Sequence, residues 1–505
     1  MNRVVIVGGG PTGIATATLL AQHGVASVVL ERWADIYPQP RAVAADDEVF
    51  RILARLGIGE DFAKISRPGL GLRLVESDLK FLNEFGREVA GVNGYPASNM
   101  FDQPVLERLL RDNLAAYPDA LLRTDVEVTA IAALPGGTVN VQFTDRRTGA
   151  QESIDADYVL GCDGANSLTR RTIGSTMTGM GFEQRWLVID IDTDEPLEQW
   201  DGVHQVCSSV RAGTYMRVTE TRHRWEFELL PNETEDDFRT LAEIAPLIRP
   251  WAPSIERLTL IRTCEYTFRA QVADRWRRGN IFLLGDAAHL TPPFIGQGMG
   301  AGLRDAMNLA WKIAGVSRGA LPESMLETYQ RERKPHARSM IRFAVAIGWA
   351  MTAGGRRGDF LRNRILPRLQ PLAARYAPSA TPALRRSALT RRTRVRGDLA
   401  GSLCPNVDLG GVRLDELVGS RVAVVTCDAL SSRQRALLAD DGVAELEVSP
   451  AGELGAWLAR GQASTAVIRP DRAVLTTGSG PRSTDELCFL ARTIARVGVV
   501  DHARR

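Results

Sequence analysis

The stretch Val4-Val5-Ile6-Val7-Gly8-Gly9-Gly10-Pro11-Thr12-Gly13 decides the fold of this chain. Its first four residues are apolar and β-branched, which is typical of a strand buried on both faces of a parallel sheet. Three of its glycines match the G-x-G-x-x-G pattern: Gly8 permits a tight turn, Gly10 lets backbone approach a pyrophosphate, and Gly13 lets a helix pack against the strand. We therefore predict that a dinucleotide binds at the positive N-terminus of the next helix.

The residues after the glycines continue a strand, helix, strand unit. The run from Ile14 to Gly24 predicts the helix, and Ser27 to Leu30 predicts the second strand. Glu31 follows that strand directly, where an acid binds the 2′-hydroxyl of an adenosine ribose, so FAD or NAD fits better than NADP. The alternative interpretation is a tight turn that binds no ligand.

Length and charge limit the remaining possibilities. A chain of 505 residues predicts two or three domains, because single cores stop growing near about 250 to 300 residues. A net charge of +2 gives no reason to expect nucleic acid or an acidic membrane as a partner. The apolar segment from Val4 to Leu30 is interrupted by glycines and lacks a cleavage pattern, so we expect no signal peptide, no membrane span and a cytoplasmic location.

The cysteines have no paired spacing along the chain. This argues against a disulfide framework, a zinc site and a CxxC redox pair, and we expect no metal and reduced thiols. The six are Cys162, Cys207, Cys264, Cys404, Cys427 and Cys488.

Two later motifs also follow apolar strands. Residues 158–167 read YVLGCDGANS, and residues 281–289 read IFLLGDAAH, with PPFIGQGMG at 292–300. Together with the N-terminal glycines, these motifs occur in an order and at separations that resemble those of the class A flavoprotein aromatic hydroxylases, a family of FAD-dependent monooxygenases. The runs at 41–48, 224–227 and 331–333 are similar to the branch that contains the 3-(3-hydroxyphenyl)propionate hydroxylases.

This resemblance implies an α/β fold with a Rossmann-like FAD-binding domain formed by residues 1–75, 98–180 and 262–353. An inserted antiparallel β-sheet domain, residues 76–97 and 181–261, would bind the substrate, and the alternating run from Trp225 to Leu229 supports strands there. A linker or helical segment, 354–399, would lead to a thioredoxin-like C-terminal domain, 400–505. Because that domain lacks CxxC, we expect it to be structural or to form a homodimer.

The cofactors implied by the resemblance are FAD and a transiently bound NAD(P)H, since the chain has only one dinucleotide fingerprint. The FAD contacts are expected to come from all three motifs and from two intervening segments. They are Gly8, Gly10, Pro11, Thr12, Gly13, Glu31, Arg32, Arg41, Ala42, Gln103, Asp163, Arg170, Gly285, Asp286, Pro293, Gly296, Gly298, Met299 and Gly300.

Several of these positions have a second interpretation. Asp286 would accept hydrogen bonds from flavin ribityl hydroxyls, or cap a helix. Arg41, near the pyrophosphate, and Arg170, near the nicotinamide, could instead form surface ion pairs. The family often has tyrosine at Met299, which puts a side-chain contact there in doubt. We expect His289 to be structural rather than a metal ligand.

The helix predicted at 303–316 would direct its N-terminus at the flavin and stabilise negative charge on the reduced ring. In the family's cycle, a hydride reduces FAD, O2 forms a C4a-hydroperoxide, and a hydroxyl group is transferred to an electron-rich ring carbon. The partners are therefore a small phenolic substrate and O2.

The residue that activates the phenol is not decided by the sequence. Candidates from the matching branch are Asp46, Asp47, Arg211, which could hold a substrate carboxylate, and Tyr266, which could face the ring. Their structural alternatives are a helix N-cap region for the aspartates, a sheet-edge charge for Arg211 and core packing for Tyr266.

Three functions remain open beside the leading one. The substrate could be a polycyclic aromatic polyketide in a tailoring pathway. The same scaffold could perform epoxidation or Baeyer-Villiger insertion. The chain could also be a flavin-binding or ligand-binding protein without turnover.

The segment from Gly354 to Arg396 is rich in arginine and poor in acids. We expect a solvated linker there. Contact with nucleic acid is the weaker alternative, because interleaved aromatic residues are missing.

Overall fold

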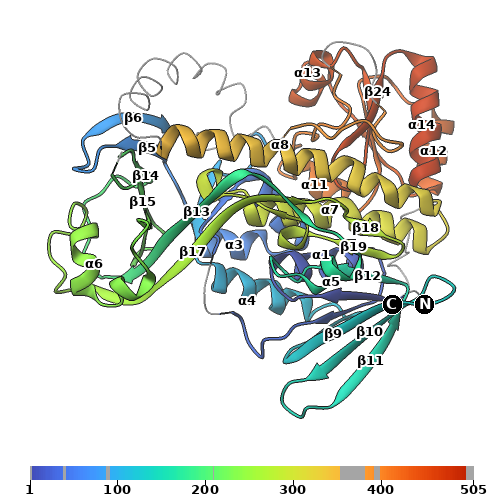
Figure 1. Cartoon of the computed structure of the whole chain (residues 1–505). Coiled ribbons are helices and arrows are strands. Elements are labelled where there is room, and N and C mark those ends of the chain that lie inside the picture. Colours follow the sequence, from blue (N-terminus) through green and yellow to red (C-terminus); the bar gives the residue numbers. More distant parts are fainter. Residues whose placement is uncertain are drawn as a thin grey trace.

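The computed structural model describes residues 3–37, 41–86, 91–208, 210–352, 382–391 and 398–495 (Figure 1). Its first sheet has six strands in the order β18-β19-β12-β1-β2-β8. Every neighbouring pair is parallel except β18 with β19. The strands are β1 (Val4–Val7), β2 (Ser27–Leu30), β8 (Ala120–Arg123), β12 (Tyr158–Gly161), β18 (Arg277–Arg278) and β19 (Ile281–Leu283). The predicted α/β fold with a buried parallel sheet is confirmed.

Helices flank this sheet. Helix α1 (Pro11–Gln22) connects β1 to β2 and packs against both α7 (Gly298–Ser317) and α4 (Gln103–Leu114). The longest helix is α8 (Glu327–Thr352), and the shorter ones are α2 (Asp47–Leu56), α3 (Gly59–Ile65) and α5 (Leu168–Thr172). None of the helices in the described ranges combines the length and apolarity that a membrane crossing requires.

Two three-stranded sheets contribute side chains to the same hydrophobic core as the parallel sheet. One has the order β11-β10-β9 and the other β3-β7-β4. Their strands are β9 (Val126–Ala133), β10 (Val139–Asp145), β11 (Gln151–Ala156), β3 (Ala44–Asp46), β4 (Ser66–Pro68) and β7 (Ser98–Phe101).

The largest sheet has eight strands in the order β20-β17-β13-β16-β15-β14-β5-β6. All its pairs are antiparallel except β14 with β5. Its long strands β13 and β17 arch from the parallel sheet toward helix α6 (Leu241–Ile248) (Figure 1). The strands are β5 (Gly71–Val75), β6 (Phe81–Gly86), β13 (Met177–Asp192), β14 (Val203–Val206), β15 (Gly213–Arg217), β16 (Arg222–Glu228), β17 (Thr259–Ala273) and β20 (His289–Leu290). Strand β5 lies in this sheet, although the expected boundary at residue 75 places it in the first domain.

The two faces of this sheet differ in chemistry because successive side chains of a strand point to opposite sides. Leu187, Ile189, Trp225 and Phe227 are buried in one core with α6 (Leu241–Ile248). Alternate positions of the same strands therefore form a second face, which carries Asp190, Arg224, Glu226 and Arg262.

The C-terminal part, residues 400–495, folds around a four-stranded sheet of order β22-β21-β23-β24, in which β21 and β22 are parallel. Its elements are α11 (Leu414–Val418), β21 (Ala423–Thr426), α12 (Ser432–Asp440), β22 (Ala444–Glu447), α13 (Glu453–Arg460), β23 (Thr465–Ile468), β24 (Val474–Gly478) and α14 (Pro481–Ala495). Its thioredoxin-like character stays a prediction. All six cysteines of the chain are free thiols.

Part of the expected solvated linker is packed instead. Among residues 382–391, Leu389 and Thr390 are buried, and the amide of Arg391 donates to the carbonyl of Leu475 at 2.7 Å. The apolar and hydroxyl side chains that interrupt the arginines explain this packing. The remainder of the stretch from 354 to 396, apart from residues 382–391, lies outside the described residues.

Candidate flavin site and substrate face

The N-terminal glycine turn has the geometry that its sequence requires. Gly8 adopts φ 103°, in the left-handed region, and its amide donates to the Leu30 carbonyl at 2.9 Å. A Cβ at Gly13 would lie 2.0 Å from the Gly8 carbonyl oxygen, so only glycine allows α1 to approach β1 this closely. At Gly10, the N-cap of α1, a Cβ would meet no atom within 4 Å. The open side of the turn therefore lies at the positive end of α1, where a phosphate could be bound.

Glu31 holds this turn from the end of β2. Its carboxylate is buried and accepts hydrogen bonds from the amides of Gly9 at 2.6 Å and Trp33 at 2.9 Å. The adjacent Arg32 stacks its guanidinium over the Trp33 ring, 5.2 Å from its centroid. A contact from Glu31 to a ribose stays a prediction.

The glycine turn and the segment beginning at Gly285 lie against each other. The hydroxyl oxygen of Thr12 is 2.9 Å from a Cβ built on Gly285 and 2.2 Å from one built on Gly302 in α7. Below this contact, Asp305 accepts hydrogen bonds from the Gly285 amide at 3.1 Å and from His289 at 2.8 Å. Two motifs separated by more than 270 residues thus form one surface, with His289 in a structural role.

Arg41, Gln103 and Asp286 converge beside that surface. The Arg41 guanidinium lies 3.1 Å from the Asp286 carboxylate, and the two side chains are 56% and 35% exposed. The Gln103 carbonyl oxygen accepts from the amides of Arg41 at 2.9 Å and Ala42 at 2.6 Å. Asp286 lies inside a short 3-10 turn and is not its N-cap. These polar groups are therefore held in place while their charges face open space.

The central Asp-Gly motif is tied to the same surface. Asp163 accepts from the Ser167 hydroxyl at 2.5 Å and from the Thr169 amide at 2.9 Å, which fixes the start of α5. Arg170 donates to the carbonyls of Ala165 at 2.6 Å and Ala287 at 3.0 Å. Arg170 thus links the Asp-Gly and Gly-Asp motifs through carbonyl oxygens rather than through a surface ion pair.

The loop before α7 is fixed from beneath. It contains the predicted contacts Pro293, Gly296, Gly298, Met299 and Gly300. Gln297, the N-cap of α7, donates to Asp46 at 2.7 Å and accepts from Arg304 at 2.7 Å. A Cβ on Gly300 would lie 2.7 Å from Val49 of α2, whereas one on Gly298 would meet no atom within 4 Å. The N-terminus of α7 is therefore packed on α2 at Gly300 and open at Gly298.

Asp46 and Asp47 point in different directions. Asp46 caps α2 through the Val49 amide at 2.7 Å and accepts from Gln297 and Arg304. Burial alone would raise the pKa of Asp46, but the Arg304 charge and these hydrogen bonds hold it below its ordinary value. Asp47 accepts instead from the amide and side chain of Asn93, at 2.9 and 3.1 Å, and burial raises its pKa to about 6 despite those bonds.

The other two catalytic candidates lie on the large sheet. Arg211, in the loop between β14 and β15, forms an ion pair with Glu233 and donates to the Glu228 carbonyl at 3.1 Å. Tyr266 lies on β17 opposite Trp186, and burial raises the pKa of its hydroxyl. That hydroxyl is near Arg262 but meets hydrogen-bond geometry with no described residue. Among the described residues, no hydrogen bond or ion pair joins these two side chains to either aspartate.

Sequence reasoning missed the polar groups on the second face of this sheet. Asp190 on β13 pairs with Arg224 at 2.7 Å and with Arg262 at 2.7 Å. Arg224 also donates to the Arg41 carbonyl at 3.1 Å, so this face adjoins the segment that bears the Arg41–Asp286 pair.

Glu226 is the unusual member of this face. It lies opposite Val188 and is only 8% exposed, and its carboxylate has no hydrogen bond or ion pair to any residue that the structure describes. Burial raises its pKa, Arg224 opposes this effect and Asp190 adds to it. The sequence does contain a signal for this polar face. In Arg222-His223-Arg224-Trp225-Glu226-Phe227-Glu228, charged residues occupy every second position, which puts all of them on one side of the strand.

Comparisons with known proteins agree with this geometry. Residues 1–344 match the family described as FAD binding domain. The chain is 33% identical to a 3-(3-hydroxy-phenyl)propionate/3-hydroxycinnamic acid hydroxylase of Burkholderia cenocepacia (strain HI2424), over 94% of this chain and 93% of that protein. It is 31% identical to a probable NADH-specific resorcinol 4-hydroxylase of Rhodococcus jostii (strain RHA1), over 97% and 94%.

Solved structures support the fold. The crystal structure of aklavinone-11 hydroxylase with FAD and aklavinone matches 98% of this chain and 99% of that one, with a TM-score of 0.82 and 22% identity. A flavin-dependent monooxygenase, PieE, in complex with FAD and substrate matches with a TM-score of 0.81 and 21% identity, over 98% of each chain.

Proposed function

The chain belongs to the FAD-binding-domain family of flavin-dependent aromatic hydroxylases, and from this premise we propose that it hydroxylates a phenol bearing a short carboxylate chain, such as 3-(3-hydroxyphenyl)propionate. The observation that carries the proposal is the contact of Thr12 with the positions of Gly285 and Gly302. It unites the glycine turn and the later Gly-Asp segment, and both are needed to hold one flavin. Two relatives named for such a substrate are 37% and 33% identical to this chain, compared with 31% for the probable resorcinol 4-hydroxylase.

The residues present fit FAD. Open space at Gly10 and Gly298 leaves room for backbone to approach a cofactor, and the exposed Arg41–Asp286 pair lies beside the surface that unites the two motifs. When bound, FAD supplies the redox chemistry by accepting a hydride from NAD(P)H and activating O2. The first turn of α7 contains no acidic residue, so its positive end is free to stabilise negative charge.

Glu226 is our candidate for the group that accepts the phenol proton. A carboxylate with a raised pKa and no partner among the described residues is suited to accept a proton. Asp190 on the same face is less suited, because Arg224 and Arg262 already occupy it. Tyr266, whose hydroxyl meets hydrogen-bond geometry with none of the described residues, would orient the ring from β17.

Arg211 stays our candidate for binding the substrate carboxylate. Its guanidinium already pairs with Glu233, so a carboxylate substrate would compete with that side chain. This predicts a modest contribution from Arg211 to substrate affinity.

The test is a coupled assay on the purified yellow protein. Oxidation of NADH or NADPH should accelerate many-fold with 3-(3-hydroxyphenyl)propionate and yield a hydroxylated product in proportion to the nicotinamide consumed. The matched control is 3-phenylpropionate, which lacks the activating hydroxyl and should give no product. Acceleration and product only with polycyclic phenols would favour the tailoring alternative, and a lactone or epoxide would change the reaction class. If the bound flavin were not reduced in the presence of any aromatic compound, this result would contradict enzymatic turnover.

A further inference from the structure

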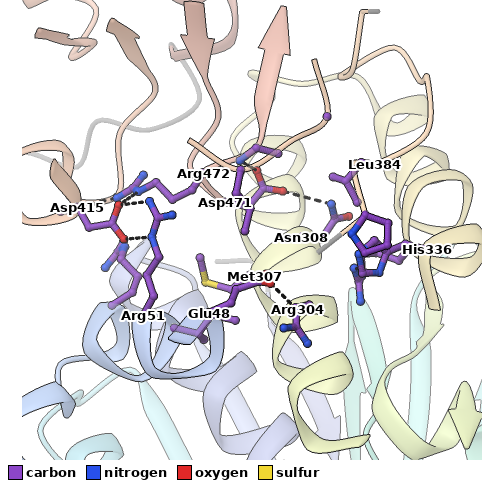
Figure 2. Close-up of a pocket in the computed structure, with 17 residues that line it drawn as sticks. Glu48, Arg51, Arg304, Met307, Asn308, His336, Leu384, Asp415, Asp471 and Arg472 are labelled. Atoms are coloured by element: carbon purple, nitrogen blue, oxygen red, sulfur yellow. Dashed lines mark hydrogen bonds and ion pairs between the residues drawn. The ribbon is translucent and has the colours of Figure 1, made fainter. Parts of the chain in front are cut away.

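A cavity lies between the flavin-binding part and the C-terminal part of the molecule. Figure 2 shows it between α2, α7 and the segments around Asp415 and Arg472, and its volume is about 60 Å³. Its lining includes five arginines and three carboxylates. The FAD and substrate contacts proposed above do not involve this cavity.

On one side of the cavity, both guanidinium groups are paired with carboxylates. Arg304 lies 2.8 Å from Asp46 and 2.9 Å from Glu48. Arg333 lies 2.8 Å from Asp305. This side, which includes the base of the flavin loop, has no excess of positive charge.

The other side has three guanidinium groups and one carboxylate. Arg51 binds both oxygens of Asp415 at 2.7 Å, and Arg472 binds one of them at 2.7 Å. The two arginines hold the pKa of Asp415 far below its ordinary value, against the effect of burial. The single negative charge of Asp415 is thus shared by two arginines. Arg55 is the third arginine on this side.

Arg55 has only neutral partners. It donates to the Gln22 side-chain oxygen at 2.8 Å and to the Ser420 hydroxyl at 2.5 Å, and no carboxylate of the described residues lies within ion-pair distance. Its Nε hydrogen is buried and has no acceptor among the described residues. Burial and the nearby Arg472 charge lower the pKa of Arg55 to about 10, although the more distant Asp415 carboxylate opposes this effect.

A neighbouring histidine is affected by the same charge. Burial, followed by the charges of Arg55, Arg318 and Arg472, lowers the pKa of His23 to about 3. This side of the cavity therefore holds three guanidinium groups, Arg51, Arg55 and Arg472, whose charge the single carboxylate of Asp415 compensates only in part. Leaving a guanidinium without a counter-charge in a poorly solvated place is costly.

We propose that this side of the cavity is a binding site for a small oxyanion such as inorganic phosphate, held by Arg55 between the two parts of the chain. The charge of Arg472 would attract the anion, although its N–H groups already donate to Asp415, Pro470 and Gly419. Guanidinium groups bind oxyanions through paired N–H donors, and Arg55 retains such donors beside the cavity. The bound anion would bridge α2 to the loop at Ser420 and so strengthen the attachment of the C-terminal part. This inference is independent of the substrate proposal.

The test uses the FAD-loaded protein, so that phosphate cannot enter the flavin site, with flavin absorbance monitored throughout. Inorganic phosphate is titrated at constant ionic strength against sodium chloride while the melting temperature is measured. We expect a saturable rise of about 2–4 °C with phosphate beyond that with chloride. Arg55→Gln should abolish this increment. The control Arg435→Gln, which removes an exposed guanidinium from α12, should retain it.

Equal increments in wild type and Arg55→Gln, or equal effects of chloride and phosphate, would overturn the proposal. If Arg55→Gln does not fold, calorimetric titration of the wild-type holoenzyme decides the question. One saturable phosphate site per chain is expected, and the absence of saturable heat would overturn it.

Discussion

The carboxylate of Asp286 lies 3.1 Å from the guanidinium of Arg41, and 245 residues of sequence separate the two. Both side chains are partly exposed, so their ion pair contributes little to the stability of the fold. Its main effect is to orient the two side chains toward open space. A carboxylate held in this way can accept hydrogen bonds from cofactor hydroxyl groups.

Asp286→Ala should therefore yield folded protein with little FAD. We expect the dissociation constant for FAD to rise at least about tenfold, because the lost hydrogen bonds involve a charged acceptor. The ratio of flavin to protein absorbance after purification, and titration of the apoprotein by flavin fluorescence, measure the effect. Glu60→Gln, an exposed change on α3, should leave the FAD content unaltered.

Gly302→Ala should disrupt the packing of α1 on α7. The added Cβ would lie 2.2 Å from the Thr12 hydroxyl oxygen, which is closer than any real contact allows, so we expect a loss of about 1–3 kcal/mol in the free energy of unfolding and weaker FAD binding. Gly298→Ala, four residues earlier in the same helix, meets no atom within 4 Å and should cost little. The second change Thr12→Ala removes the clashing oxygen and should restore part of the stability. A Gly302→Ala variant as stable as wild type would contradict this close packing.

Arg211→Ala should retain FAD, because Arg211 lies in the loop between β14 and β15 and contacts Glu233 and Glu228. If Arg211 binds the substrate carboxylate, KM for 3-(3-hydroxyphenyl)propionate should rise several-fold, while KM for resorcinol, which has no carboxylate, should stay the same. Steady-state kinetics with both phenols measures this. An unchanged KM for the carboxylate substrate would remove Arg211 from the substrate site.

The glycine turn of the candidate flavin site could be predicted from the sequence because its constraints are local. Gly8 and Gly13 are needed by a turn and a helix that follow within a few residues, and the glycine pattern records this directly. The substrate face could not be predicted in the same way. Asp190, Arg224 and Arg262 come from three strands, and their pairing depends on the register of the sheet. Asp46 illustrates the same limit, since its partner Arg304 is 258 residues away and no local pattern connects them.

Asp47→Asn should alter how stability depends on pH. The folded protein holds the Asp47 pKa at about 6, above its ordinary value of 3.8, so the native state binds the proton more tightly than the unfolded state. Its contribution to stability is therefore full below about pH 4 and is lost as pH rises through 6. The introduced amide would still accept the hydrogen bonds of Asn93 but carry no charge. Relative to wild type, the variant should gain melting temperature between pH 4 and 7, and an unchanged difference across that range would contradict the assignment.

Glu226→Gln separates a catalytic carboxylate from a merely buried one. Since burial raises the pKa of Glu226 above its ordinary value, its ionised form opposes folding at neutral pH, and the neutral amide should raise the melting temperature there but not below pH 4. If Glu226 also accepts the phenol proton, kcat at neutral pH should fall by about 100-fold and the acid limb of the pH profile of kcat/KM should disappear. Glu228→Gln, the next position along the same face of β16, is the matched control and should keep both the rate and the pH profile. A variant that is more stable yet turns over normally would assign Glu226 no part in the reaction, because its charge would then affect folding alone.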